Sequence, residues 1–446
     1  MISLILAAGK GTRMKSEKPK VIHKVNGVPM LKRAVKTLEN IGIKKNVFVL
    51  GHKKEEVLEV MGEIQYVEQK EQLGTGHAIL IAKEKIEEFK EDVLITYGDA
   101  PLLTEKTLNE MKRAFTEKNL DCILLSCRVS DPFGYGRIIK KDGNVVDIIE
   151  EKEATEEQKK IVEVNTGVYI FKYDKLISSI AKIDNNNSKG EYYLTDAVKI
   201  LSEMGSKVET YQIDDEDEVL GVNSKAQLAQ AGRILRNRKN TELMDLGVIL
   251  IDPETTYIEE DVEIGEDTVI YPNVTIQGKT QIGKNCIIFG NTRIENSRIS
   301  DNVKIESSLI EQSEIEKDVT VGPFAHLRPK TYLKENVHIG NFVEIKNAVL
   351  EKGVKAGHLT YVGDAEVGAD TNIGAGTITC NYDGKNKHKT KIGEKSFVGS
   401  NSIIVAPVEI GNNTLTAAGS VITENVPDNA LALGRARQVI KEGWKK

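Results

Sequence analysis

The chain has 446 residues, which is enough for two or three domains with substantial hydrophobic cores. Its formal net charge of −6 gives no reason to expect nucleic acid or an anionic membrane as a partner. Its four cysteines make no disulfide framework, and the opening apolar run from Ile2 to Ala8 is too short to span a bilayer. We therefore expect a protein of the reducing cytoplasm with no membrane span.

Residues 1 to about 220 alternate strand-like apolar runs with amphipathic helical stretches. This alternation predicts an α/β, Rossmann-like layered domain with a largely parallel sheet, in which ligands bind at the carboxyl ends of the strands. We expect strands at Ser3–Ala7, Asn46–Leu50, Val93–Tyr97, Cys122–Val129 and Gly167–Phe171, and helices at Met30–Ile41 and Glu105–Glu117.

A glycine-rich loop follows the first strand, with the sequence LAAGKGTRM from Leu6 to Met14. Gly9 and Gly11 allow a tight turn whose backbone N–H groups can approach an anion. The dinucleotide fingerprint fails because Met14 stands where its third glycine would be, and no P-loop follows. A solvated basic loop is the alternative, but glycines together with many cations favour a triphosphate site. The cations are Lys10, Arg13, Lys15, Lys18 and Lys20.

Three further polar or helical segments complete the first half. Asp99 ends an apolar strand, where a lone carboxylate with phosphate oxygens suits Mg²⁺, although a capping aspartate before Pro101 is an equally common arrangement. The acidic run Asp214–Glu218 is more simply a solvated loop than a metal site. Ser224 to Leu246 has the composition of a long helix between two domains.

In the second half an apolar residue returns every six positions. A period of six fits neither a helix nor an alternating strand, and β-sandwich strands recur at roughly 8–12 residues. The period is typical of a solenoid whose short strands each turn one apolar side chain inward. The repeat slips by one at intervals and then recovers. Its members are Ile258, Ile264, Ile270, Ile276, Ile282, Ile288, Ile294, Ile299, Ile305, Ile310, Ile315, Val321, Leu327, Leu333, Ile339, Ile345, Ile404, Ile410 and Ile422.

The solenoid is expected from about Asp252 to Val426, with one interruption. The segment Asn381–Thr390 carries no six-step apolar residue and must leave the coil as a loop. Its basic residues are, on spacing alone, simply solvated. His358 lies among small residues that leave a concave surface, although a lone histidine is more often structural than catalytic. Cys380, beside the loop, is by default a buried structural cysteine.

Many short motifs resemble one family, the bacterial bifunctional N-acetylglucosamine-1-phosphate uridyltransferases and glucosamine-1-phosphate acetyltransferases. They span essentially the whole chain in the family's order. Besides LAAGKGTRM they are EQLGTGHA (71–78), YGDAPLL (97–103), GYGRI (134–138), VNTG (164–167), GEYYLTD (190–196), GVN (221–223), GPFAHLRP (322–329), GNFVEIK (340–346), KAGHLTYVGD (355–364), NIGAGTITCNYDG (372–384) and FVGS (397–400).

The resemblance implies a nucleotidyltransferase domain in residues 1–222, a linker helix in 223–250 and a left-handed parallel β-helix of hexapeptide repeats with a tail in 251–446. In the first domain it implies Asp99 and Asn223 as Mg²⁺ ligands and Arg13 and Lys20 as catalytic cations. Gln69 can read a pyrimidine edge through its amide, and Gly74-Thr75 can lie against a flat base. The implied residues for UTP and the sugar nucleotide are Leu6, Ala7, Ala8, Gly9, Lys20, Gln69, Gly74, Thr75, Tyr97, Gly98, Asp99, Gly136, Glu150, Asn165 and Asn223.

In the β-helix the resemblance implies that His358 is the general base, a role that imidazole suits near neutral pH. It implies Arg328, Glu344, Lys346, Tyr361 and Asn372 for the acceptor sugar phosphate, with Asn381, Tyr382 and Lys387 orienting the sugar and its anions beside acetyl-CoA. It implies Ala375, Ser400, Ala418 and Arg435 in the acetyl-CoA groove. One departure is His326, where the family's GPFARLRP run has arginine.

The implied function is acetylation of glucosamine 1-phosphate from acetyl-CoA, followed by UMP transfer from UTP to N-acetylglucosamine 1-phosphate. The implied partners are these small molecules, Mg²⁺ and two further copies of the chain in a homotrimer. Two rival functions remain: a single-activity nucleotidyltransferase whose solenoid only assembles the oligomer, and a non-catalytic sugar-nucleotide sensor or scaffold.

Overall fold

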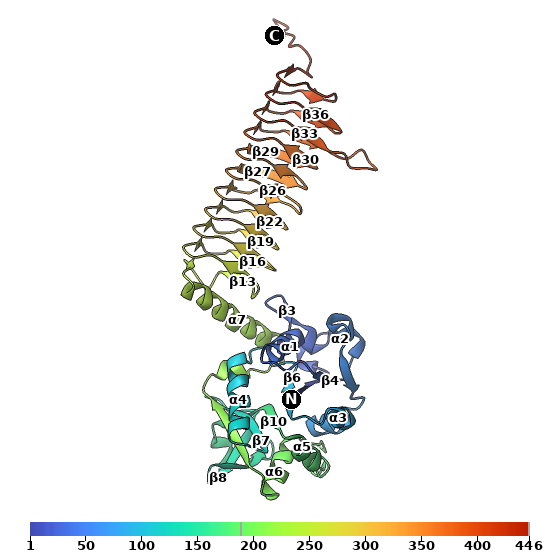
Figure 1. Cartoon of the computed structure of the whole chain (residues 1–446), viewed down its shortest axis with the longest axis vertical. Helices are drawn as coiled ribbons and strands as arrows, with labels where there is room; N and C mark the ends of the chain where they lie inside the picture. Colours follow the sequence, from blue (N-terminus) through green and yellow to red (C-terminus); the bar gives the residue numbers. More distant parts are fainter. Residues whose placement is uncertain (188–189, 445–446) are drawn as a thin grey trace. The chain divides into compact units, whose positions relative to one another are not determined.

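The computed structural model describes residues 1–187 and 190–444. The chain divides into two compact units, Met1–Leu235 and Arg236–Lys446. Figure 1 shows a sheet with helices in the first and a stack of coils in the second. The long helix α7 (Lys225–Asp245) agrees with the expected helix to within one residue at each end.

The first unit is built on a nine-stranded sheet with the order β11-β7-β10-β6-β1-β4-β5, to which β8 and β9 add a hairpin on β10. The expected strands and helices are present. They are β1 (Ile2–Ala7), β4 (Asn46–Leu50), β5 (Gln65–Glu68), β6 (Val93–Tyr97), β7 (Cys122–Arg128), β8 (Gly136–Lys141), β9 (Asn144–Ile149), β10 (Glu163–Phe171), β11 (Val208–Ile213), the small pair β2 (Lys24–Val25) and β3 (Val28–Pro29), and the helices α1 (Met30–Asn40), α2 (Lys54–Met61), α3 (Thr75–Phe89), α4 (Glu105–Glu117), α5 (Tyr173–Ile180), α6 (Thr195–Glu203) and the short η1 (Thr12–Met14), η2 (Lys20–Ile22), η3 (Gln158–Lys160) and η4 (Glu216–Val219).

The sheet is parallel except around β10. Strands β1, β4, β5 and β6 pair in parallel, as do β7 and β11, whereas β10 runs antiparallel to both β6 and β7. The expected parallel sheet is therefore interrupted by one reversed strand. That strand and the β8–β9 hairpin bring Asn165 and Gly136 into register.

Both faces of this sheet are covered, which explains why β1 is apolar at nearly every position. Ile2, Leu4 and Leu6 face one core, which they share with residues of α3, α5 and α6. Ile5 and Ala7 face the other core, with residues of α1, α2 and α4. The unit is thus a three-layer α/β domain whose loops are free to build a site at the sheet's edge.

The acidic run Asp214–Glu218 is exposed from Asp214 to Asp217, as expected of a solvated segment, but its last residue departs from that expectation. Glu218 is buried; its carboxylate accepts hydrogen bonds from the backbone N–H of Thr104 (3.1 Å) and the hydroxyl of Thr107 (3.0 Å) at the start of α4. Glu216 binds Ser130 in the same way. Acidic side chains here anchor a helix and a loop, and no three-residue acidic, histidine or cysteine metal cluster occurs among the described residues.

The second unit is a parallel β-helix. Each strand pairs with the strand one coil further on, at a sequence separation of 18 residues in regular coils. Its strands are β12 (Ile249–Leu250), β13 (Tyr257–Ile258), β14 (Glu263–Ile264), β15 (Val269–Ile270), β16 (Thr275–Gln277), β17 (Gln281–Ile282), β18 (Ile287–Ile288), β19 (Arg293–Glu295), β20 (Arg298–Ile299), β21 (Lys304–Ile305), β22 (Leu309–Glu311), β23 (Glu314–Ile315), β24 (Thr320–Val321), β25 (His326–Leu327), β26 (Tyr332–Leu333), β27 (His338–Lys346), β28 (Val349–Leu350), β29 (Lys355–Gly363), β30 (Ala365–Val367), β31 (Asn372–Ile373), β32 (Ile378–Cys380), β33 (Thr390–Ile392), β34 (Phe397–Val398), β35 (Ile403–Val405), β36 (Val408–Ile410), β37 (Leu415–Thr416), β38 (Val421–Ile422) and β39 (Leu431–Ala432).

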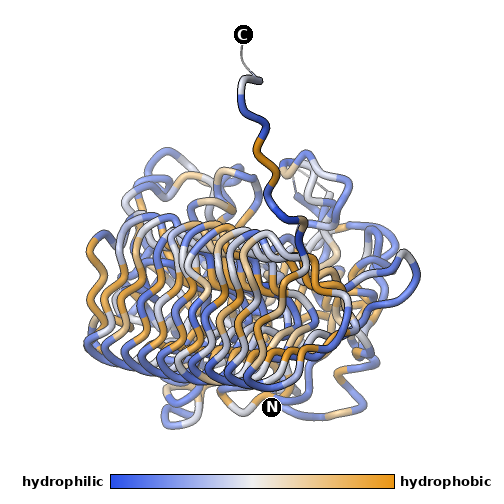
Figure 2. Tube along the Cα trace, turned by 90° about the horizontal axis from the view of Figure 1, so that it is seen from above, coloured by the Kyte–Doolittle hydropathy of each residue, from blue (hydrophilic) through white to orange (hydrophobic). Residues whose placement is uncertain are grey.

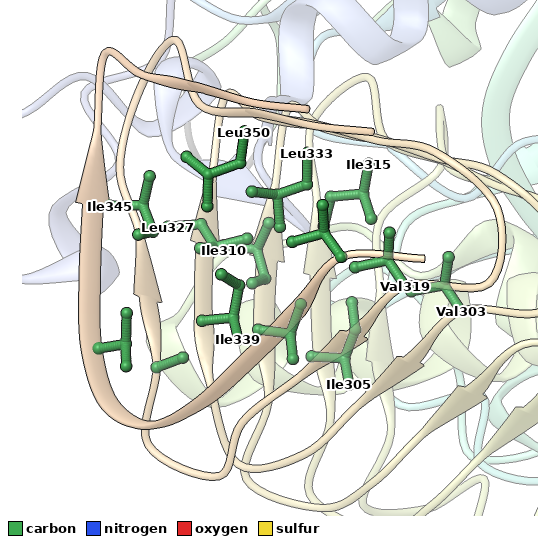
Figure 3. Close-up of a cluster of buried hydrophobic side chains, with 14 of the residues drawn as sticks. Val303, Ile305, Ile310, Ile315, Val319, Leu327, Leu333, Ile339, Ile345 and Leu350 are labelled. Atoms are coloured by element: carbon green, nitrogen blue, oxygen red, sulfur yellow. The ribbon is translucent and has the colours of Figure 1, made fainter. Parts of the chain in front are cut away.

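Every apolar residue of the six-step repeat is buried, as the sequence predicted. Figure 3 shows core side chains, among them Ile305, Ile310 and Ile339, inside the coils, and Figure 2 shows the same order of apolar and polar stretches recurring from coil to coil. Repeating one inward side chain per strand therefore builds a continuous core without long strands.

Where the six-step repeat slips by one, a side of the coil has five residues instead of six. Such sides shorten some coils, so that paired residues of successive coils are 16 residues apart. Ser297, Ser308 and Ser313 close these sides, each hydroxyl donating to the backbone carbonyl two residues earlier at 2.6–2.8 Å. The serines are buried, and each hydroxyl finds its hydrogen-bond partner in the tighter corner. The spacing between apolar residues falls from six to five because the corner has one residue fewer, while the apolar side chain of that strand still faces the core.

Coil corners require a left-handed backbone, which asparagine tolerates better than most residues. Asn273, Asn285 and Asn291 fill this position in regular coils. Three bulky residues take it near the middle of the column: Phe324 (φ 60°), Phe342 (φ 57°) and Leu359 (φ 46°). Their side chains are exposed, and the two phenylalanine rings stack with centroids 5.5 Å apart.

The predicted loop does leave the column, between β32 and β33 (Figure 1). Coils on either side of it are separated by 25 residues instead of 18. Asn381 and Thr390, at its two ends, are buried. Cys380 is half-buried beside it, whereas the three other cysteines are buried.

Candidate active sites

A cavity of about 480 Å³ opens in the first unit at the carboxyl ends of its parallel strands. Leu6 and Tyr97, which are in register on β1 and β6, form its floor with Ala8. Gln69 enters from the end of β5, where its backbone N–H continues the pairing with Leu50. This is the place at which open α/β sheets bind ligands.

Most residues expected for the nucleotide line this cavity. Gly98, Gly136 and Asn223 do not line it, although each is next to or paired with a residue that does, and Arg13 is exposed on η1 outside it. The expected residues that line it are Leu6, Ala7, Ala8, Gly9, Lys20, Gln69, Gly74, Thr75, Tyr97, Asp99, Glu150 and Asn165.

Lys20 lies between the two residues expected to hold a metal. Its Nζ donates to Asp99 Oδ2 and to Asn223 Oδ1, the latter at 2.8 Å, and the side chains of Lys20 and Asp99 are 13% and 16% exposed. Two oxygens separated by over a hundred residues thus converge on one cation. A carboxylate and an amide oxygen are hard ligands of the kind Mg²⁺ takes, with phosphate oxygens and water completing its shell. The residues therefore fit a magnesium ion.

The glycine loop makes this placement of Lys20 possible. Gly11 has φ 60°, and a Cβ there would lie 2.7 Å from Cβ of Lys20. A side chain at this position would be strained by the backbone and would also push Lys20 from Asp99. The turn expected from Gly9 and Gly11 thus serves to pack the loop against Lys20.

The opposite wall of the cavity comes from β10 and its hairpin. Asn165 Nδ2 donates to the hydroxyl of Tyr169 at 2.7 Å, and the Thr195 hydroxyl lies 3.4 Å from Glu150 Oε1. Burial, with Asp99 and Glu150 nearby, raises the pKa of Tyr97 well above its usual range, so its hydroxyl stays protonated. This wall offers a neutral phenol, an amide and a carboxylate to a polar ligand.

Sequence reasoning missed part of the lining. Beyond the expected residues, the cavity is formed by Val21, Val49, Gln72, Ala78, Tyr169, Glu191, Tyr193, Leu194 and Thr195. Four of these lie in the motif GEYYLTD, which had been noted only as a resemblance. The backbone N–H of Leu194 donates to Thr75 Oγ1 at 3.1 Å, so the motif is tied to the start of α3.

In the second unit His358 lies on β29 opposite Asn341 of β27. Its Nδ1 is 2.7 Å from Asn341 Oδ1. An amide oxygen can only accept, so Nδ1 carries the proton and Nε2 presents a lone pair. Asn341 was not expected from the sequence. The imidazole is exposed, and a base of fixed tautomer stands on the surface of the coil.

Three residues expected for acetyl-CoA continue the column that begins with Asn341 and His358. Strand pairing aligns one residue on each of five successive coils: Ile339, Ala356, Ile373, Val398 and Thr416. The residues two positions after these therefore stack in a column along the coil axis. Those residues are Asn341, His358, Ala375, Ser400 and Ala418. Small side chains thus extend along the coil axis from the base. Arg435 follows Gly434, whose backbone pairs with Val421 at the same end.

Positive charge gathers on the neighbouring face. Lys387 of the loop and Arg328, which directly follows β25, lower the pKa of Lys346 on β27, so these three cations lie close together. Arg328 Nη1 also donates to Glu344 Oε1 at 2.7 Å. The loop therefore brings Lys387 to Lys346 of the same chain. Such a cluster stabilises an anion with several oxygens.

The base of the loop is fixed by a buried carboxylate. Asp364 accepts hydrogen bonds from the side-chain amides of Asn347 and Asn381, and Asn381 Nδ2 is also 3.4 Å from the hydroxyl of Tyr361. Within the loop, the hydroxyl of Tyr382 donates a hydrogen bond to the carbonyl oxygen of Gly384 at 2.7 Å.

Asn372 is placed on β31, in register with Lys355 one coil earlier. His326 pairs with Glu311 at 2.8 Å, which leaves Arg328 free to pair with Glu344.

A polar cavity at the carboxyl ends of a parallel sheet and an exposed imidazole on a hexapeptide coil fit a transferase with two sites. The family models agree: residues 3–161 match the MobA-like NTP transferase domain, residues 261–296 and 389–424 the bacterial transferase hexapeptide, and residues 289–375 the GlmU-like C-terminal hexapeptide. The coil is consistent with the left-handed β-helix that the resemblance implies.

Relatives match the whole chain. "Bifunctional protein GlmU" of Thermoanaerobacter pseudethanolicus is 51% identical over 100% of this chain and 97% of its own length. The proteins of that name from Streptococcus agalactiae and Clostridioides difficile are 48% identical over 99% of this chain and 97% and 96% of theirs. The chain belongs to the GlmU family of bifunctional proteins and is a nucleotidyltransferase and acetyltransferase. None of the described helices combines the length and apolarity that crossing a bilayer needs.

Proposed function

We propose that the second unit acetylates the amine of glucosamine 1-phosphate and that the first then transfers UMP from UTP to the product. Uridyl transfer is assigned to residues 1–222, and acetyl transfer to residues 251–446, with 223–250 as the helix joining them. The observation that carries the proposal is that one chain presents both a polar cavity with converging oxygens at Asp99 and Asn223 and an exposed imidazole of fixed tautomer at His358.

In the first site we propose in-line attack by a sugar phosphate oxygen on the α-phosphorus of UTP, with pyrophosphate leaving. Mg²⁺ held by Asp99 and Asn223 would neutralise charge on the phosphate oxygens. Lys20 binds these same two residues, so a small movement of its ammonium would bring it to a phosphate. Arg13, exposed on the loop, can turn its guanidinium to the outer phosphates.

For the sugar, we assign Glu150, Asn165 and Gly136 to the hydroxyl and N-acetyl groups. Gly136 is in register with Asn165, and a Cβ on it would lie 3.8 Å from Glu150 Oε1. A side chain there would therefore narrow the space that a ring needs. Gln69 and Gly74 are assigned to the base.

In the second site the Nε2 lone pair of His358 would take a proton from the amine as its nitrogen attacks the thioester carbonyl. The C–S bond then breaks and the CoA thiolate leaves. Asn341 stabilises the Nδ1–H tautomer that this step requires. Arg328, Lys346 and Lys387 would bind the phosphate of the sugar, and the column of small residues ending near Arg435 would accept the coenzyme.

We propose that the active assembly is a trimer. The support is the strip formed by Phe324, Phe342 and Leu359, which are 59%, 55% and 63% exposed. This strip lies next to His358 in the chain and along adjacent coils. Strained, bulky residues exposed beside a catalytic group favour burial against a second copy, which would also enclose the acetyl-CoA groove. We place the protein in the cytoplasm, where its nucleotide and CoA substrates are found.

The decisive experiment supplies the full chain with Mg²⁺, UTP, acetyl-CoA and glucosamine 1-phosphate, and follows CoA thiol and pyrophosphate together. Thiol release should precede pyrophosphate release, and omission of acetyl-CoA should abolish both. Supplying N-acetylglucosamine 1-phosphate should restore pyrophosphate release alone. If N-acetylglucosamine 1-phosphate gives pyrophosphate but no mixture of substrates releases thiol, the single-activity enzyme is favoured. If neither product is released from any mixture, the sensor is favoured.

A further inference from the structure

His77 makes contacts that bear on which nucleotide the first site accepts. It lies in the first turns of α3, half-buried, and its ring stacks on that of Tyr192 at 6.1 Å. It does not line the cavity itself. Its Nδ1 is 3.2 Å from Nε2 of Gln69, which does line the cavity and is 4% exposed.

The Gln69 amide is held by two acceptors. Nε2 donates one hydrogen to the carbonyl oxygen of Gly74 at 3.1 Å. A carbonyl oxygen can only accept, so the second hydrogen of Nε2 is the one that points to His77 Nδ1. Turning the amide over would set Oε1 against the Gly74 oxygen and lose both bonds. His77 and Gly74 together therefore fix which end of the amide faces outward.

The end left for a ligand is an acceptor. Gln69 Oε1 receives no hydrogen bond within residues 1–187 and 190–444. Nearby, the backbone N–H of Gly74 also has no partner among the described contacts, at the amino end of α3. Gly74 is fixed in place, because Tyr192 binds the neighbouring Leu73 and Gly76 through its backbone at 2.8 and 2.7 Å.

Gln69 Oε1 and the Gly74 N–H, an acceptor beside a donor, can form two hydrogen bonds with one pyrimidine base but not with the other. Uracil offers N3–H and O4, a donor beside an acceptor, whereas cytosine offers N3 and N4–H₂, an acceptor beside a donor. We propose that His77 is a positioning residue that selects uridine over cytidine nucleotides by holding the Gln69 amide with Oε1 outward. This inference rests on the proposed uridyl transfer and assigns its base specificity to a residue that does not touch the base.

The test compares kcat/KM for UTP and CTP with N-acetylglucosamine 1-phosphate, measured by pyrophosphate release. His77→Leu removes the acceptor while filling the space; it should lower the UTP to CTP ratio about tenfold, mainly through KM for UTP. His77→Asn keeps an acceptor near the position of Nδ1 and should restore most of the ratio. Lys83→Ala, on the exposed face of the same helix, should leave it unchanged.

Equal losses with both nucleotides in His77→Leu would mean that His77 only packs against Tyr192, and would overturn the inference. A second measurement needs no variant: 3-methyluridine triphosphate, which lacks N3–H, should be used by the unmodified enzyme about a hundredfold less well than UTP. Equal use of the two would also overturn it. If the unmodified enzyme releases no pyrophosphate from UTP at all, the proposed function fails first, which separates the two outcomes.

Discussion

The two units assemble their reactive groups in different ways. In the first, Lys20, Asp99 and Asn223 are far apart in the sequence and meet because loops leave the same edge of a sheet. In the second, Asn341 and His358 meet because strand pairing sets one coil directly on the next. Sheet topology gathers residues at one edge, whereas a solenoid stacks them in columns.

This difference affects how complete each site is within one chain. The cavity of the first unit has walls, and its charges are already paired with one another. The column of the second has an exposed base and small residues but only one side. The surface of the solenoid in one chain is therefore open, whereas the α/β unit encloses its cavity within one chain.

The largest expected effect separates the units completely. Asp99→Ala removes a proposed metal ligand and leaves the Lys20 ammonium without its carboxylate, so we expect uridyl transfer to fall about 10³–10⁴-fold, or roughly 4–5.5 kcal/mol of transition-state stabilisation. Acetyl transfer should be unchanged. Both rates are measured on one sample, with Asp131→Asn on an exposed loop as the control. A parallel loss of acetyl transfer would contradict the independence of the two sites.

The reciprocal change tests the solenoid. His358→Ala should lower acetyl transfer about 10²–10³-fold, within the range of a lost general base, and leave pyrophosphate release from UTP unaltered. His338 begins β27, three residues before Asn341, and its Nδ1 is 2.7 Å from Thr320 Oγ1, so His338→Ala is the matched histidine control. Retention of acetyl transfer in His358→Ala would rule out the proposed base.

How far the sequence predicted each unit follows from the same contrast. The core of the β-helix could be predicted position by position, since each inward residue, such as Ile276 or Ile305, depends only on its own short strand. In the α/β unit the expected strands were found. The reversal of β10 was not foreseen, because the direction of a strand is set by long-range pairing rather than by local pattern.

Site residues divide in the same way. Asp99 and His358 could be proposed because they stand in motifs, and the resemblance also paired Asp99 with Asn223, but the partner of His358 could not be proposed. Asn341 is identified by its register with His358 one coil later, and His77 by an amide eight residues away whose orientation no sequence shows. Glu218 looked solvated because its two threonine partners lie over a hundred residues away. Partners of this kind are determined by tertiary contacts.

A smaller effect tests whether the contact between Asn341 and His358, which strand pairing creates, contributes to acetyl transfer. Asn341→Leu removes the oxygen that holds His358 Nδ1–H, and we expect acetyl transfer to fall about tenfold, the worth of roughly one hydrogen bond. Asn341→Asp keeps an acceptor and should stay within about threefold of the unaltered enzyme. The measurement is kcat/KM across pH, because a group that acts only on folding would lower it equally at every pH. Equal losses in the two variants would contradict a tautomer-fixing role.

The smallest effect concerns Asp196, a carboxyl group of the first unit that forms no ion pair with another of the described residues. Burial, with Asp147 and Asp184 nearby, raises the pKa of Asp196 at the start of α6 to about 6. A carboxyl whose pKa is raised on folding stabilises the fold below its ordinary value, and that contribution is lost as pH rises toward 6. Asp196→Asn should therefore stabilise the unit above pH 6 by about 1 kcal/mol, discounted for partial exposure, and have little effect near pH 4. The measurement is the temperature of half-inactivation of uridyl transfer at pH 5 and pH 7.5, with Asp174→Asn on the exposed start of α5 as control. A gain that is equal at both pH values would show that the asparagine acts through packing, because only the loss of a buried charge makes the gain grow between them.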